Sequence, residues 1–327
     1  MIFSKDKWSD SDELNKFIPV SAALSFERVE SSLNDAFRLF ILPLFGEQLS
    51  AEIESYYSNT DATEIQRKLL EECQRAVANL AFWYNYTELN VRITDQGMQR
   101  QESADGTFKG TYKYQEDQLR NSFRNKGFNS IDRMIEFLDT HADEFSGYEQ
   151  SPAYVQRKQA IVRSTAEVDK ICFINKSHLI FLRLKPLFQV VEETQLQPVL
   201  GSELYRALTQ ALADGTKTIG ETTTEELRIR CAQYVIFKAI AELARATGSL
   251  TDRGLYFANL TAGDGNLQMS PADRETAAAL AINYERQADG YLTLLQTFIE
   301  NDLPAYYKGR QIDALDRDNT DKRTFWA

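Results

Sequence analysis

The chain has 327 residues, and 37 Lys and Arg against 48 Asp and Glu give it a net charge of −11. This acidic balance argues against a nucleic-acid-binding protein that neutralises many phosphates. The hydrophobic content of 43% argues against a disordered chain, and only 15 Gly and 7 Pro favour long helices. With two His and three Cys there are few candidate metal ligands or nucleophiles, so we expect no enzyme, metal or cofactor.

Residues 1–16 carry charges throughout and have no continuous apolar run, so they predict no signal peptide. No window approaches the roughly 18 apolar residues of a membrane span. We therefore expect a soluble protein made in a cytoplasm, with no membrane partner. Cys73, Cys172 and Cys231 are far apart among apolar neighbours, which predicts buried free thiols.

Three landmarks occur twice, in the same order, at separations of 155, 157 and 159 residues. They are a P-x-x-G-x-x-L turn, a T-D-x-G turn and an Asp-Gly pair. Because the spacing drifts by only two residues per step, the ordered set predicts two homologous halves. The first half holds Pro43, Gly46, Leu49, Thr94, Asp95, Gly97, Asp105 and Gly106, and the second holds Pro198, Gly201, Leu204, Thr251, Asp252, Gly254, Asp264 and Gly265.

Each half reads as the same series of helices. Residues 21–42 and 177–196 have apolar side chains at helical spacing, and the following Pro and Gly predict a helix end and a tight turn. Short helices follow at 47–57 and 202–212. Long apolar helices at about 62–90 and 223–247 are expected at the centres of the two cores, and each half closes with further helices.

Gly, Thr and aromatic residues then predict one β-hairpin per half, near 97–114 and near 254–269. Asp105-Gly106 and Asp264-Gly265 are the expected hairpin turns. The predicted fold is mainly α, with two tandem homologous helical bundles that each project a hairpin. Its parts are an N-terminal extension (1–16), repeat 1 (17–150), a connection (151–170), repeat 2 (171–301) and a C-terminal tail (302–327).

Searches for catalytic and metal-binding patterns favour structural interpretations. His141 and His178 lack the Glu-x-x-His spacing of di-iron helical bundles. Asp313, Asp316 and Asp318 lie in a polar tail without an apolar helical stripe. Residues 263–266 resemble part of a calcium loop but lack the regular oxygen ligands and the closing Glu.

The tail carries an aromatic pair, Phe325-Trp326, after some twenty polar residues. Aromatic side chains dominate many protein interfaces, and this pair has no local core to join. We therefore expect Phe325 and Trp326 to bind a neighbouring subunit. Two-stranded hairpins are marginal alone, so we expect them to contact neighbours as well.

The repeated P-x-x-G-x-x-L turn, long apolar helix, T-D-x-G turn and hairpin resemble head–tail connector (adaptor, or head-completion) proteins of tailed bacteriophages and prophages of Bacteroidetes. The resemblance covers both halves, although typical adaptors are smaller and carry one such unit. It implies a structural virion protein, assembled in the bacterial host cytoplasm, that forms a ring with itself around the DNA channel. Its implied partners are the portal protein, neck or tail proteins, and DNA that passes without sequence-specific binding.

The acidic surplus fits a channel wall along which DNA slides, because cationic walls would hold it. Two other classes stay open. One is a helical enzyme that uses carboxylates at the interface between the two repeats. The other is an intracellular scaffold that binds peptides in a groove between its helices.

Overall fold

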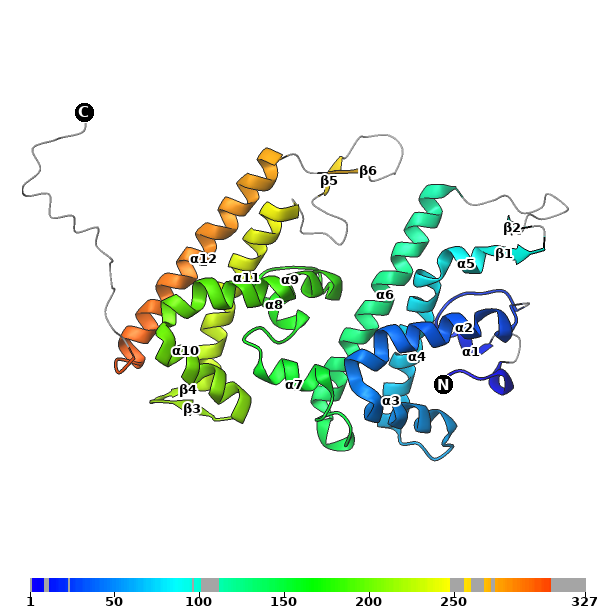
Figure 1. The fold of residues 1–327 in the computed structure, drawn as a ribbon, viewed down its shortest axis with the longest axis horizontal. Coiled ribbons are helices and arrows are strands. Elements are labelled where there is room, and N and C mark those ends of the chain that lie inside the picture. Colours follow the sequence, from blue (N-terminus) through cyan, green and yellow to red (C-terminus); the bar gives the residue numbers. More distant parts are fainter. Residues whose placement is uncertain are drawn as a thin grey trace, which may run out of the picture. The chain divides into compact units, whose positions relative to one another are not determined.

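The computed structural model describes residues 2–8, 12–22, 24–95, 97–100, 112–247, 256–259, 268–271 and 274–306. The chain divides into two compact units, Met1–Arg183 and Leu184–Ala327, each treated separately below. Both are mainly helical, and each carries an antiparallel β-hairpin between its two longest helices (Figure 1). The predicted fold class of tandem helical bundles with hairpins is therefore confirmed.

Unit 1 consists of short 3-10 segments, α-helices, one π-helix and one hairpin. In chain order these are η1 (Lys5–Lys7), α1 (Asp12–Asn15), α2 (Phe26–Ala36), the π-helix η3 (Phe37–Ile41), α3 (Leu42–Ser58), α4 (Glu64–Tyr84), α5 (Tyr86–Asn90), β1 (Val91–Thr94), β2 (Gly97–Arg100), α6 (Lys113–Thr140), η4 (Ala142–Glu144), α7 (Pro152–Gln159) and α8 (Thr165–Ile171).

Helix α9 (His178–Val191) crosses from unit 1 into unit 2. Unit 2 continues with the π-helix η5 (Glu192–Leu196), α10 (Gln197–Asp214), the short strands β3 (Thr218–Ile219) and β4 (Thr222–Thr223), α11 (Thr224–Thr247), β5 (Tyr256–Asn259), β6 (Gln268–Pro271) and α12 (Arg274–Asp302).

The core of unit 1 forms where α4 packs against α6. Leu69, Cys73, Val77 and Leu80 recur at three and four residues along α4 and are fully or almost fully buried. Each such side chain contributes roughly 1.5–3 kcal/mol to folding. A Cβ on Gly127 of α6 would lie 2.5 Å from Leu80 Cγ, so this glycine lets the two helices approach closely.

Helix α4 begins at a capping box that the sequence contains in plain form. Thr63 Oγ1 accepts from Gln66 N at 3.2 Å, and the Gln66 side chain accepts from Thr63 N at 3.0 Å. Two otherwise unpaired N–H groups are thereby satisfied at the helix start.

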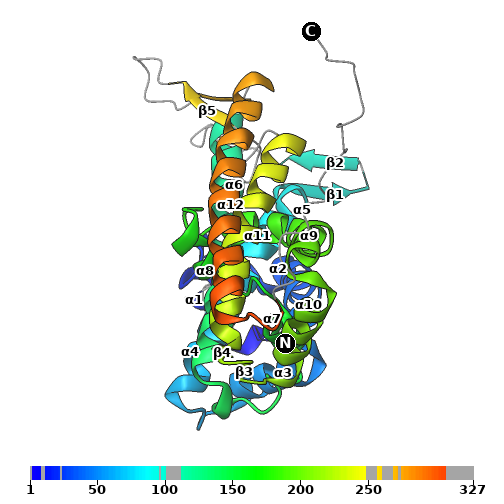
Figure 2. The same ribbon diagram turned by 90° about the vertical axis from the view of Figure 1, so that its left-hand side faces the viewer.

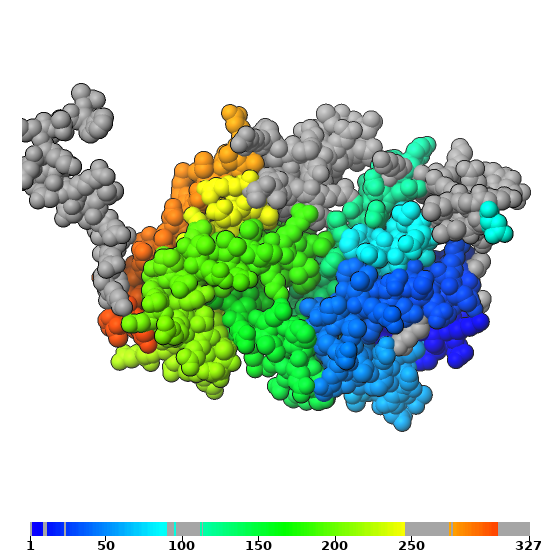
Figure 3. All heavy atoms as spheres, in the orientation of Figure 1, coloured from blue at the N-terminus to red at the C-terminus, as the bar shows by residue number. Residues whose placement is uncertain are grey.

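Unit 2 has the same antiparallel pair in α11 and α12, which lie side by side in yellow and orange (Figures 2 and 3). Cys231, Val235 and Ile240 of α11 are fully buried. Cys231 occupies the place of Cys73, with Leu227 and Val235 corresponding to Leu69 and Val77. Cys73 and Cys231 are buried free thiols as expected, whereas Cys172 is partly exposed.

The structure describes a hairpin at the T-D-x-G landmark of the first repeat. Strand β1 pairs with β2 so that Thr94 faces Gly97, with Asp95 in the turn between them. The T-D-x-G landmark is therefore the hairpin turn itself, because a two-residue loop closes two antiparallel strands most tightly. The expected turn at Asp105-Gly106 lies outside the described residues.

The second hairpin overlaps its predicted position only in part. Strands β5 and β6 pair from Tyr256↔Pro271 to Asn259↔Gln268, close to the predicted 254–269. Asp264 and Gly265 fall between these strands, and Asp252 and Gly254 precede them, all outside the described residues.

Two predicted boundaries change. Residues 1–16 were expected to form an extension, but Ile2, Phe3 and Leu14 are buried in the core of unit 1. Residues 151–170 were expected to connect the repeats, but α7 and α8 belong to unit 1, which ends at Arg183. Long-range side-chain contacts, described below, hold both segments on the first bundle.

Candidate functional site

The most distinctive local feature is a bend between two helices that occurs once in each repeat. In unit 1 the chain leaves α2 through the π-helix η3, passes Pro43 in the first turn of α3, and breaks at Gly46 with φ 77° and ψ 172°. In unit 2 it leaves α9 through η5, passes Pro198 and breaks at Gly201 with φ 74° and ψ 156°. We call each bend an elbow.

The sequence predicted a helix end at the proline, whereas helical structure continues to the glycine. A proline is tolerated here because the first residues of a helix need no N–H partner. The preceding π-helix holds one extra residue in its turn, a geometry that is frequent at functional positions. At Gly46 and Gly201 a side chain would be strained, because this backbone region is nearly exclusive to glycine.

A cavity of about 390 Å³ opens at the elbow of the first repeat. It is lined by residues of α2 and η3 on one side and of α3 on the other, namely Asn34, Phe37, Arg38, Leu42, Glu47, Ser50, Ala51 and Glu54. Its size falls in the range of pockets that hold small ligands, about 300–1,000 Å³. The lining combines an aromatic ring, two carboxylates and one guanidinium.

Ser50 is the unusual residue of this cavity. Its side chain is 3% exposed, and its hydroxyl has no hydrogen-bond partner within the described residues. A buried hydroxyl without a partner costs roughly 1–3 kcal/mol. The small Ser50 side chain therefore lies beneath the cavity lining, and its hydroxyl is a local cost to stability.

The elbow of the second repeat places a tyrosine where the first has Ser50. Tyr205 follows Gly201 by four residues, just as Ser50 follows Gly46. Burial raises the pKa of Tyr205, and the carboxylates of Glu192 and Glu193 on η5 raise it further. The tyrosine therefore lies close to η5, across the elbow from its own helix.

Glu192 takes the position of Phe37 and is only partly exposed. Burial and the neighbouring Glu193 raise the pKa of Glu192 to about 7. Gln189 Nε2 donates to Glu193 Oε1 at 2.9 Å one turn away. The second elbow thus places a tyrosine near the carboxylates of η5, and burial moves the pKa of Glu192 towards neutral pH.

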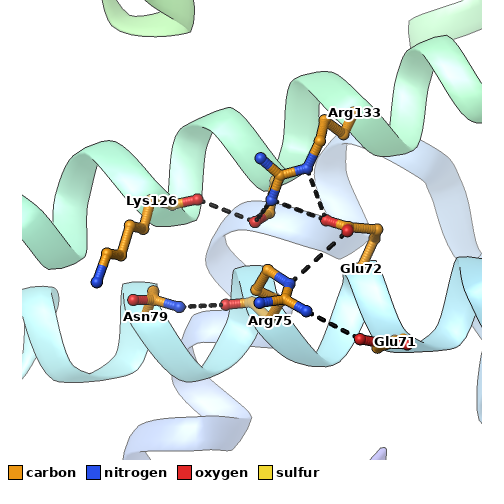
Figure 4. Close-up of polar contacts among 7 residues, drawn as sticks. Glu71, Glu72, Arg75, Asn79, Lys126 and Arg133 are labelled. Carbon is orange, nitrogen blue, oxygen red and sulfur yellow. Dashed lines mark hydrogen bonds and ion pairs between the residues drawn. The ribbon is translucent and has the colours of Figure 1, made fainter. Parts of the chain in front are cut away.

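A charged network joins α4 to α6 in unit 1 (Figure 4). Arg133 of α6 pairs with Glu72 of α4 at 3.0 Å, and Arg75 pairs with Glu71 at 2.8 Å. Arg133 Nη2 also donates to Ser130 Oγ at 2.8 Å, and that hydroxyl donates to the Lys126 carbonyl oxygen at 2.9 Å. Figure 4 shows these side chains between the ribbons of the two helices, so their role is to fix the helix pair.

A second polar cluster fastens α8 and the start of α9 to α6. Thr165 Oγ1 lies 2.8 Å from Asp132 Oδ1, and His178 Nδ1 lies 2.9 Å from the same oxygen. His178 also stacks against Phe128 and Phe181. The hydroxyl and the carboxylate meet the same ring nitrogen, whereas a catalytic triad uses opposite nitrogens, so the cluster is structural.

The N-terminal segment is held by a buried carboxylate, Glu13. Its Oε2 accepts from the Tyr57 hydroxyl at 3.2 Å and its Oε1 from Gln74 Nε2 at 3.1 Å, while Gln74 also donates to the Ile2 carbonyl at 2.7 Å. Burial raises the pKa of Glu13, and these two hydrogen bonds oppose the rise.

The predicted site residues stand as follows. Pro43, Gly46, Pro198 and Gly201 lie at the two elbows, and Asp95 and Gly97 lie at the turn of β1–β2. Asp105, Gly106, Asp252, Gly254, Asp264, Gly265, Phe325 and Trp326 lie outside the described residues. Sequence reasoning missed the cavity at Ser50 and the Asp132 cluster, although the Ser50/Tyr205 difference was visible once the repeats were aligned.

Among the residues that the structure describes, no group of three or more His, Cys, Asp and Glu is arranged to hold a metal ion. His141 instead lies with Nδ1 2.9 Å from the Phe137 carbonyl oxygen and stacks on the Phe137 ring. Over the same part of the chain, no helix combines the length and the apolar character needed to cross a membrane.

Comparison with known proteins bears on the duplication. No curated protein and no solved structure matches the chain. One family model, described as a family of unknown function (DUF6712), matches twice, at residues 41–158 and 196–312. The two matches start 155 residues apart, which is the separation of the two elbows. The chain belongs to the DUF6712 family and contains two copies of its unit.

Proposed function

We propose that this protein is a head–tail connector subunit of a tailed phage or prophage. In this proposal it forms a ring that joins the portal to neck or tail proteins and surrounds the DNA channel. The observation that carries the proposal is the pair of isolated hairpins. Each is a two-stranded ribbon at one end of a long antiparallel helix pair, and within the described residues its strands pair only with each other.

Such ribbons are marginal in water without a third strand or a covering helix. A neighbouring subunit can supply that cover by strand addition or by packing on one face. In a ring each subunit meets the next through a heterologous interface, so a hairpin on one side contacts a different surface on the next copy. The two longer hairpins, β1–β2 and β5–β6, one in each repeat, suit a subunit with two neighbours.

The net charge of −11 supports the channel in this proposal. DNA slides through a ring most easily when the channel wall does not bind its phosphates. Each cationic side chain on the wall would strengthen that binding. The acidic surplus supplies such a wall without any sequence-specific contact.

Location in the particle tests the proposal directly. Particles induced from a host that carries the gene are purified and labelled with gold-conjugated antibodies against the chain. We expect label at the junction of head and tail, and the protein in the particle proteome at a fixed ratio to the portal. A chain that is absent from purified particles, or spread over the capsid, would overturn the connector function.

A further inference from the structure

We propose that the elbow cavity of the first repeat is the receptor for Phe325 and Trp326 of a second copy of the chain. The proposal rests on the self-association in the proposed function, and it adds the surface that receives the tail. It starts from the difference between the two elbows. The second repeat carries the large Tyr205 at the position of Ser50, whereas the first carries the small Ser50 beside a cavity of about 390 Å³.

The lining of this cavity suits an aromatic side chain. Phe37 and Leu42 provide apolar contact, and the Arg38 guanidinium can stack on an indole face, the commonest form of cation–π contact. A tryptophan therefore suits both the volume of the cavity and its apolar and cationic lining.

Charge also matches the tail. Lys322 and Arg323 precede Phe325-Trp326 by two to four residues, which is roughly 7–13 Å in an extended chain. The cavity carries Glu47 and Glu54 on α3, and Glu47 is exposed. An extended segment with its rings in the cavity would bring these cations to the carboxylates of α3.

The length of chain allows a copy-to-copy contact. Phe325 lies 19 residues beyond Tyr306, the last residue that the structure describes, and that segment spans up to about 60 Å when fully extended. The tail is therefore long enough to extend well beyond the unit from which it starts.

Binding of a tail peptide tests the receptor. A fluorescein-labelled peptide of residues 318–327 is titrated with the full chain carrying Trp326→Ala, which leaves the cavity free of its own anchor, and anisotropy is recorded. We expect saturable binding. Ser50→Tyr should weaken it about tenfold or more, because this substitution introduces the tyrosine that the second repeat has at the same position. Ala51→Tyr, at an exposed position in the lining, should weaken binding similarly, whereas Ser58→Tyr, two turns further along α3, should leave it unchanged.

Charge reversal provides a second, positive test. Glu47→Lys should weaken binding of the natural peptide several-fold, and a peptide with Lys322→Glu and Arg323→Glu should recover binding to that variant. If the natural peptide does not bind, or binds equally to the Ser50, Ala51 and Ser58 variants, the receptor assignment is wrong.

Mixing two variants separates a second copy from the chain's own tail. Ser50→Tyr keeps the tail and blocks the cavity, and Trp326→Ala keeps the cavity and removes the anchor. Native mass spectrometry of the mixture should show association between the two variants that neither variant gives alone. If the peptide binds but the two variants do not associate, the occupant is not a second copy. If the chain associates through the cavity but forms no closed ring, the ring function fails while the receptor stands; a chain that stays monomeric at every concentration overturns both. If rings form without peptide binding, the receptor fails alone.

Discussion

Both repeats bend at the same place, with a π-helix, a proline and a glycine at positive φ, but they fill the bend differently. The first has Phe37 and Ser50 in the lining of an open cavity, and the second has Glu192 and Tyr205 at the equivalent positions, where the carboxylate raises the pKa of the tyrosine. The helix pairs show a similar contrast. Glu72 and Arg133 tie α4 to α6, whereas Lys238 and Arg245 both meet Glu285 between α11 and α12.

The comparison separates what the fold requires from what each copy is free to change. Elbow glycines recur because the backbone there excludes side chains. The side chains around the elbow and the ion pairs between the helices differ, because different residues at these positions can give comparable stability. The cavity at the elbow of the first repeat, beside residues that the second repeat replaces, is therefore where we expect a function specific to one repeat.

The largest expected effect comes from the shared glycines. Gly46→Ala and Gly201→Ala should each lower the free energy of unfolding by about 2–3 kcal/mol, because both impose a Cβ on a glycine-only backbone region. An added Cβ at Gly201 meets nothing within 4 Å, so strain alone is tested there. Urea unfolding measures both. Gly290→Ala inside α12 is the control and should stabilise by about 0.5–1 kcal/mol. If Gly201→Ala leaves the free energy of unfolding unchanged, the two elbows are not equivalent.

A pH-dependent effect should appear only in the second elbow. The raised pKa of Glu192, about 7, means that the folded state holds its proton more tightly than the unfolded state. Its stabilising contribution is full below about pH 4.5 and is lost as the pH rises through about 7. Glu192→Gln should therefore raise stability at pH 8 by about 1–2 kcal/mol, after allowance for partial exposure, and leave it unchanged at acidic pH.

Thermal unfolding at a series of pH values checks this expectation. Glu193→Gln, at the exposed neighbouring position, is the matched control and should give a smaller change of the same sign, since Glu193 contributes to the shift at Glu192. An equal response of the two variants would show that the desolvation of Glu192 is unimportant.

The smallest effects should come from the ion pairs between helices. A double-mutant cycle with Glu72→Gln and Arg133→Gln should give a coupling energy of about 0.5 kcal/mol, because this pair is partly exposed. The less exposed Lys238–Glu285 pair should give about 1 kcal/mol and respond less to added salt. A reversed order would mean that burial does not set the strength of these pairs.

Local patterns in the sequence predicted the repeat and the places where the chain bends. Each half was expected to close with two helices, whereas α6 and α12 are each a single helix. Pro43, Gly46 and their counterparts act through their own backbone, so their effects can be read without tertiary contacts. Duplication made this more certain, because each half could be checked against the other.

Features that depend on distant residues could not be predicted in this way. Asp132 meets Thr165 and His178 across 33 and 46 residues, so nothing local places α8 on unit 1. The buried Glu13 likewise depends on Tyr57 and Gln74. Strand pairing places a hairpin turn at the T-D-x-G landmark, where Asp95 lies, and the Asp105-Gly106 pair lies outside the described residues.

The central claim is that a duplicated chain with one open elbow assembles with copies of itself. Native mass spectrometry of the full chain over a range of concentrations tests this most directly. The account predicts a closed assembly of a single subunit number, which Ser50→Tyr converts to smaller species. A chain that stays monomeric under all conditions would contradict it.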